Sequence, residues 1–120
     1  LDKHPKLRVV IGHQGEGLPA LLTRFDEQYD PLVPKFLQRP VTQMLQDQLH
    51  ITTSGFYSIP SFMMLMQTFG ADKLMFSVDY PYSDNAVARK FLDDLPVSPA
   101  DKVKISHGNA ERLLKIKPAA

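Results

Sequence analysis

A short apolar segment that ends directly in a carboxylate does most to constrain the fold of this chain. Residues 74–78 read Leu-Met-Phe-Ser-Val, and Asp79 follows them at once. Such a run is typical of a strand that is buried on both faces, as in a parallel sheet covered by helices. Active sites of parallel α/β folds lie at the carboxyl ends of the strands. Asp79 is therefore the first candidate for a functional residue, because a charge at that point needs a partner or a metal ion.

Two further short strands are predicted, at about residues 7–12 and 50–54, besides the one at about 73–78. Helical patterns follow the strands, for example Leu18, Leu22 and Phe25 after the first one. Strands that alternate with helices favour a parallel sheet, so the predicted fold class is α/β. Three strands are too few to close a barrel, and an open three-stranded sheet has unpaired edges. We therefore expect one domain or an incomplete part of one.

Cap and turn residues predict where the remaining helices begin and end. Helices are expected over about residues 42–48, 58–70, 84–95 and 98–105. Asn109 is expected to cap a last helix, and His50 is expected to be a surface residue just before a strand. Residues 30–40 contain three prolines and are predicted to be irregular.

The composition argues against several classes of function. The formal net charge is +1 and the basic residues are scattered, so a nucleic-acid partner is not expected. No apolar segment approaches the roughly 20 residues of a membrane span. The absence of cysteine excludes disulfides and thiolate metal sites, and it fits a cytoplasmic protein. The chain begins Leu-Asp-Lys-His-Pro, which we interpret as a segment from within a longer protein.

Three segments in this order resemble the C-terminal part of the metal-dependent amidohydrolase-related family. They are residues 4–16 (His-Pro-Lys-Leu-Arg-Val-Val-Ile-Gly-His-Gln-Gly-Glu), 76–82 (Phe-Ser-Val-Asp-Tyr-Pro-Tyr) and 108–114 (Gly-Asn-Ala-Glu-Arg-Leu-Leu). More narrowly, they resemble the branch of nonoxidative aromatic-acid decarboxylases related to aminocarboxymuconate-semialdehyde decarboxylase and γ-resorcylate decarboxylase. The resemblance implies that residues 1–120 are one partial segment, about three βα units, of a TIM-like (β/α)₈ barrel and contain its sixth to eighth strands.

The resemblance also implies roles for individual residues. Asp79 matches an aspartate that ligates a divalent metal, zinc or manganese, and that handles a proton. His13 matches an acid/base histidine beside the metal, and Glu16 matches its acidic partner. Arg24 matches an arginine that reaches the substrate carboxylate from a neighbouring subunit, and Tyr80 either lines the substrate pocket or packs at the barrel mouth. The family's other metal ligands lie upstream of this chain, and one carboxylate does not make a zinc site.

Taken without the resemblance, the same residues have simpler interpretations. Asp79 and His13 are suited to turns after strands, and Glu16 is suited to the N-terminus of a helix. His107 is interpreted as structural, because the resemblance implies no ligand at its position.

The function that the resemblance implies is nonoxidative decarboxylation of an aromatic or unsaturated carboxylic acid by a homo-oligomer. One alternative is hydrolysis of an amide or lactone on the same scaffold, because metal-bound hydroxide suits that reaction as well. A second alternative is a truncated, non-catalytic module that associates with itself. Under each of these interpretations we expect the 120-residue chain alone to be inactive.

Overall fold

A single three-stranded sheet lies at the centre of the computed structural model, which describes residues 1–117, with the backbone alone for residues 32 and 34. The strands are β1 (Val9–Ile11), β2 (Leu49–Thr52) and β3 (Leu74–Met75), and they lie in the order β1–β2–β3. Both pairings are parallel, with Val10 beside His50 and Ile51 beside Leu74. The predicted parallel α/β arrangement is confirmed.

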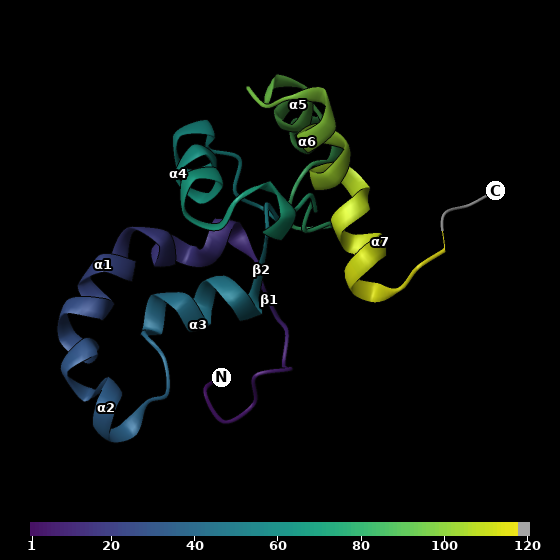
Figure 1. Ribbon diagram of the computed structural model, residues 1–120. Coiled ribbons are helices and arrows are strands. Elements are labelled where there is room, and N and C mark those ends of the chain that lie inside the picture. The colour runs from purple at the N-terminus through teal and green to yellow at the C-terminus, as the bar shows by residue number, and fades with distance from the viewer. Residues whose placement is uncertain (118–120) are drawn as a thin grey trace.

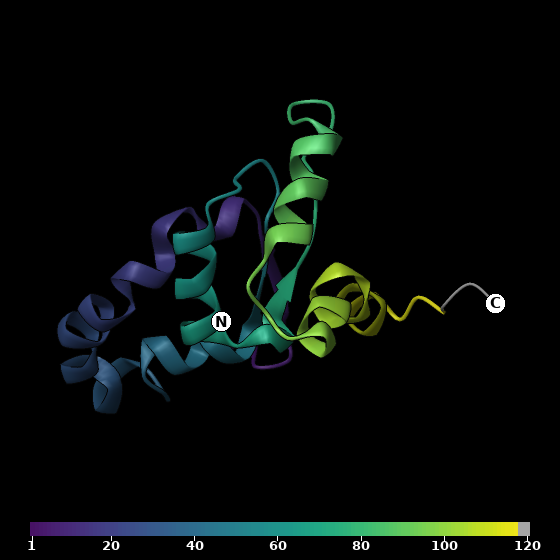
Figure 2. The same ribbon diagram turned by 90° about the horizontal axis from the view of Figure 1, so that it is seen from above.

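Helices connect the strands and pack around the sheet. They are α1 (Leu18–Tyr29), α2 (Val33–Phe36), α3 (Val41–Gln48), α4 (Ile59–Phe69), α5 (Asn85–Asp94), α6 (Pro99–Val103) and α7 (Asn109–Leu114). In both ribbon views, α1 to α4 lie to one side of the strands and α5 to α7 to the other (Figures 1 and 2). None of the helices within residues 1–117 is long and apolar enough to cross a membrane.

The predicted caps account for three of the helix starts. Ser58 accepts a hydrogen bond from the backbone of Ser61 before α4, and Asp84 accepts two from the first turn of α5. Ser98 accepts one from the backbone N–H of Asp101 before α6. These side chains satisfy backbone donors that have no partner inside a helix.

Several predicted boundaries are wrong. The third strand spans two residues rather than 73–78, because the backbone N–H of Phe76 donates to Ile105 and that of Ser77 to the Thr53 hydroxyl. Residues 30–40, predicted to be irregular, contain the short helix α2.

Two single-residue predictions are also corrected. Asn109 does not cap a helix: a π-helical turn (Lys104–Gly108) joins α6 to α7, so Asn109 already has helical dihedrals. Its buried side chain instead donates 2.7 Å hydrogen bonds to the carbonyls of Ala71 and Leu74. His50 does not stand before the second strand but within it, where it is buried.

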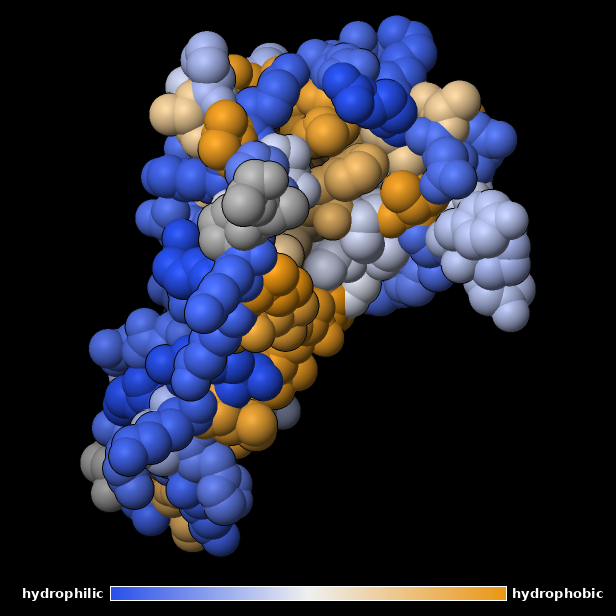
Figure 3. All heavy atoms as spheres, turned by 90° about the vertical axis from the view of Figure 1, so that its right-hand side faces the viewer, coloured by the Kyte–Doolittle hydropathy of each residue, from blue (hydrophilic) through white to orange (hydrophobic). Residues whose placement is uncertain are grey.

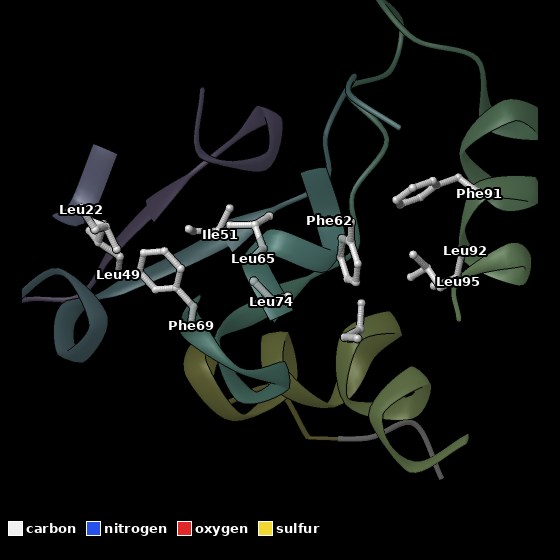
Figure 4. Packing of buried hydrophobic residues seen from close by; sticks show 11 residues of the cluster. Leu22, Leu49, Ile51, Phe62, Leu65, Phe69, Leu74, Phe91, Leu92 and Leu95 are labelled. Atoms are coloured by element: carbon white, nitrogen blue, oxygen red, sulfur yellow. The ribbon is translucent and has the colours of Figure 1, made fainter. Parts of the chain in front are cut away.

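The hydrophobic core fills the space between the sheet and the helices. Figure 4 shows side chains from the strands meeting those of α4, α5 and their neighbours, and the members labelled there are Leu22, Leu49, Ile51, Phe62, Leu65, Phe69, Leu74, Phe91, Leu92 and Leu95. Phe62 lies edge-on to Phe91, with ring centroids 5.8 Å apart, an arrangement that aromatic pairs prefer. This core fixes α4 and α5 against β2 and β3.

The face of the sheet opposite the core is exposed at β1 but buried at His50 of β2 and at Met75 of β3. Successive side chains of a strand point to opposite faces, and Val10 of β1 is 49% exposed although its neighbours Val9 and Ile11 pack against the core. A space-filling view shows apolar residues gathered across one side of the molecule between polar margins (Figure 3). This exposed apolar surface is larger than scattered single residues would make.

Candidate functional site

The candidate site lies where the three strands end. His13 follows β1 after Gly12, Ser54 and Gly55 come shortly after β2, and Asp79 ends the segment that continues from β3. Because the strands are parallel, these residues all lie at the same edge of the sheet.

His13 stands between two carboxylates. Its Nδ1 lies 3.0 Å from Glu16 Oε1, and its Nε2 lies 3.4 Å from Asp79 Oδ2. The side chains of His13, Glu16 and Asp79 are 46%, 72% and 36% exposed, so solvent reaches all three. The 3.4 Å separation is longer than an ordinary hydrogen bond, as catalytic contacts often are before a substrate binds. The two contacts can orient the ring from both sides.

The backbone that carries His13 and Glu16 is a left-handed turn. All five residues from His13 to Gly17 have positive φ angles, from 48° to 81°. Left-handed helical geometry costs non-glycine residues roughly 1–2 kcal/mol each. Gln14 anchors the turn, since its buried side chain donates a 2.9 Å hydrogen bond to the carbonyl of Phe56. Asp79 also has a positive φ, 72°, and strain of this kind clusters at functional sites.

The structure brings some of the predicted site residues together and leaves others apart. His13, Glu16 and Asp79 form one cluster, although they come from segments 66 residues apart in the chain. Arg24 lies on α1, 67% exposed, where its ion-pair partner at 3.8 Å is Glu27 of the same helix. Tyr80 follows Asp79 directly and is 74% exposed.

Sequence analysis missed the residues that surround this cluster. Ser54 accepts a 3.2 Å hydrogen bond from the backbone N–H of His13, and Thr53 is hydrogen-bonded to Ser77. Gln14 was also missed. The run Thr-Thr-Ser-Gly at residues 52–55 was the available signal, since hydroxyl and glycine residues directly after a strand stand at the same edge as Asp79.

The cluster supplies part of a metal site. A carboxylate and an imidazole are donors that zinc and manganese accept, and Asp79 fits one ligand position. Within residues 1–117, however, no group of three or more His, Cys, Asp or Glu side chains gathers where it could hold a metal ion. The described residues therefore do not complete a metal site by themselves.

The other histidines lie in different surroundings. His50 is buried near the opposite ends of the strands, where burial and the charges of Lys73 and Arg112 lower its pKa below the usual 6.5. His107 contacts Glu111 at 3.1 Å on the exposed surface of the C-terminal helices, in line with its interpretation as structural. A hollow of about 560 Å³ lies at residues 3–7, before β1 and so at the other end of the strands from His13.

Comparison with known proteins identifies the family. A family model described as amidohydrolase matches residues 1–116. The chain belongs to the amidohydrolase family. The predicted resemblance is thereby confirmed at family level.

Its relatives include decarboxylases of aromatic acids. The γ-resorcylate decarboxylase of Rhizobium sp. (strain MTP-10005) is 34% identical in an alignment of 118 residues that covers 96% of this chain and 36% of that enzyme. The crystal structure of 5-carboxyvanillate decarboxylase from Sphingomonas paucimobilis has a TM-score of 0.90 at 29% identity, over 97% of this chain and 36% of that one. Dihydroxybenzoic acid decarboxylase from Polaromonas sp. JS666, with bound manganese and the inhibitor 2-nitroresorcinol, has a TM-score of 0.89 at 32% identity, over 98% and 36%.

The chain thus spans about 36% of the length of these amidohydrolase-family relatives. Its three parallel βα units match that share of the barrel enzymes, so the predicted fold class is confirmed.

Proposed function

We propose that this chain forms the C-terminal part of a metal-dependent decarboxylase of an aromatic carboxylic acid, with His13 as its acid/base residue. The observation that carries the proposal is the position of His13, whose ring nitrogens face Glu16 and Asp79 at the carboxyl ends of the strands. The likeness to γ-resorcylate and 5-carboxyvanillate decarboxylases supports this reaction over amide or lactone hydrolysis.

His13 acts as the proton donor in this proposal. Nonoxidative decarboxylation places a proton on the ring carbon that carries the carboxylate, and a histidine suits that step near neutral pH. The proton comes from Nε2, because Nδ1 is in contact with Glu16. As the new C–H bond forms, the bond to the carboxylate breaks, carbon dioxide leaves, and the electron pair of the broken bond restores the aromatic ring. Glu16 orients the imidazole during this step.

Asp79 is the residue that we assign to the metal. Asp79, together with ligands from outside this chain, would hold a divalent ion, which would supply a Lewis acid for the substrate carboxylate. Arg24 and Tyr80 complete the proposal as substrate contacts. A guanidinium pairs bidentately with a carboxylate, and Arg24 is exposed enough to reach the site of a neighbouring subunit in a homo-oligomer. Homo-oligomerisation and a cytoplasmic location remain predictions.

The test is made on the full-length protein that carries this sequence, loaded with manganese. Carbon dioxide release is measured with γ-resorcylate and with 5-carboxyvanillate. We expect release from an aromatic acid of this kind, and we expect His13→Asn to lower kcat by about 10²–10⁴-fold.

His107→Asn is the matched control, because His107 also contacts a glutamate but does so on an exposed helix surface. It should leave kcat unchanged. Equal kcat values for the two variants would remove His13 from the mechanism. Hydrolysis of an amide or lactone, without release of carbon dioxide from either acid, would favour the hydrolase alternative.

A further inference from the structure

The contact between His13 and Asp79 depends on the space at the carboxyl end of the middle strand. The strand order β1–β2–β3 puts two strand spacings, about 9.6 Å, between the strands that carry these residues. The two side chains nevertheless approach to 3.4 Å. They therefore meet over the carboxyl end of β2, and the residue at that point must leave room for both.

Gly55 is that residue. A Cβ atom at this position would lie 2.9 Å from Asp79 Oδ2 and 3.3 Å from His13 Cδ2, closer than ordinary van der Waals contact. Its φ of 66° is also one that residues with side chains rarely adopt. The backbone N–H of Gly55 donates a 3.2 Å hydrogen bond to Val78, the residue before Asp79. Gly55 thus touches both members of the pair and is bonded beside one of them.

The hydroxyl groups just before Gly55 bind the two outer segments. Thr53, 1% exposed, donates to the carbonyl of Ser77 at 2.8 Å and accepts from its N–H at 3.0 Å, which ties the middle strand to the segment before Asp79.

On the other side, Ser54 accepts a 3.2 Å hydrogen bond from the N–H of His13 and lies 3.0 Å from the Thr52 hydroxyl. Gly12 permits this approach, because a Cβ there would lie 2.8 Å from the Ser54 hydroxyl oxygen.

We propose that residues 52–55, the strand-end segment Thr-Thr-Ser-Gly, are positioning residues that set the separation of His13 and Asp79. Their hydroxyl groups and backbone form hydrogen bonds to both outer segments, and Gly55 has no side chain to occupy the space between the two residues. The inference rests on the proposed function, since it concerns the same pair. It assigns a role to residues that themselves carry no acid or base. Their effect is on the geometry of the pair, and small displacements of reacting groups can cost as much as about 100-fold in rate.

The test compares Gly55→Ala with Gly70→Ala in the full-length, manganese-loaded protein. Gly70 has a φ of 77°, so both alanines carry backbone strain, but a Cβ at Gly70 meets nothing within 4 Å. We expect both variants to lose thermal stability, and Gly55→Ala alone to lower kcat by at least about tenfold with a much smaller change in KM. Equal kcat values in the two variants would overturn the proposal.

A second pair of variants covers the case in which Gly55→Ala does not fold. Thr53→Ser keeps the hydroxyl that bonds Ser77, and Thr53→Val replaces it at similar volume. We expect Thr53→Ser to retain kcat and Thr53→Val to lower it, whereas equal kcat values in two folded variants would contradict the role of Thr53.

Crystal structures separate this inference from the proposed function. If the unsubstituted protein releases no carbon dioxide, the decarboxylase proposal fails, but the positioning role is still read from the His13 Nε2 to Asp79 Oδ2 distance. Gly55→Ala should widen it beyond the 3.4 Å of the glycine protein, and an unchanged distance would refute the role of Gly55.

Discussion

At the scale of single residues, Asp79 combines the properties that a metal ligand at a strand end requires. It lies at the carboxyl end of the sheet, keeps 36% of its side chain exposed, and has a backbone φ of 72° that directs it away from the strand path. The contact with His13 places an imidazole next to the proposed ligand, an arrangement that suits metal-assisted proton transfer.

Replacing the Asp79 carboxylate tests this assignment. We expect Asp79→Asn to lower manganese occupancy and to lower kcat by at least about 100-fold, because loss of a ligand should exceed the 10–100-fold effect of losing a ligand's outer partner. Occupancy is measured by elemental analysis and kcat by carbon dioxide release. Asp72→Asn is the control, since Asp72 is a surface carboxylate paired with Lys104. Full occupancy and rate in Asp79→Asn would show that the metal lies elsewhere.

The buried side chain of His50 leads to a prediction about how folding stability depends on pH. The pKa of His50 lies below its usual 6.5 in the fold, chiefly because of burial, so the unfolded chain takes up a proton at a higher pH than the folded chain does. The contribution of His50 to stability is therefore complete above about pH 6.5 and is lost as the pH falls below it. The slope from this one group is at most about 1.4 kcal/mol per pH unit.

The measurement is the free energy of unfolding in urea between about pH 7 and about pH 5. We expect His50→Gln to flatten the pH dependence, and His4→Gln, at an exposed position, to leave it as it is. The same slope in the parent protein and in His50→Gln would mean that other groups cause the acid sensitivity.

At the scale of elements, the N-cap of α5 connects local sequence to the core. Asp84 accepts hydrogen bonds from the N–H groups of Ala86 at 2.7 Å and Val87 at 3.1 Å, and the helix that follows carries Phe91 and Leu92 into the hydrophobic core. Because the loop from Asp79 leads directly into this cap, the start of α5 also limits how that loop can move.

Removing the cap should destabilise the protein without lowering kcat. We expect Asp84→Ala to lower the free energy of unfolding by about 1 kcal/mol, and Asp84→Asn to retain most of it, because an amide oxygen also accepts these hydrogen bonds. Urea unfolding measures both values. A loss in Asp84→Asn as large as that in Asp84→Ala would mean that the charge, and not the cap geometry, stabilises α5.

At the scale of the whole molecule, edge strand β1 is open to solvent on one face, whereas β3 and most of β2 are buried. Val10 of edge strand β1 is 49% exposed, and apolar surface gathers on one face of the molecule (Figure 3). Open edges and apolar faces promote association. The candidate metal site is also incomplete, because it contains one proposed ligand, whereas a catalytic zinc site has three protein ligands.

We therefore expect the purified 120-residue chain to show no decarboxylase turnover and to associate with itself. Carbon dioxide release and sedimentation velocity test the two expectations, with the full-length protein as the positive control for activity. Robust turnover by the short chain would show that it completes a site on its own, and a monomer would show that the open face is tolerated in water.

Local sequence patterns predicted most of the elements and the edge at which the candidate site lies. Apolar runs ending in Gly12 and Asp79 marked two strands, helical spacing marked α1 and α4, and the caps Ser58, Asp84 and Ser98 marked helix starts within a residue or two. These signals are local, because burial on both faces, helical periodicity and cap hydrogen bonds each involve residues close in the chain. The parallel orientation of the strands then followed from the alternation of strands and helices.

The arrangement of side chains at that edge depends on tertiary contacts. The short length of β3, the burial of His50 and Asn109, and the meeting of His13 and Asp79 over Gly55 all depend on contacts between residues far apart in the chain. A sequence pattern does not reveal which hydroxyl bonds a neighbouring strand or which glycine leaves room for two side chains. Packing determines these features, because strands that are distant in sequence come within hydrogen-bonding distance only in the folded protein.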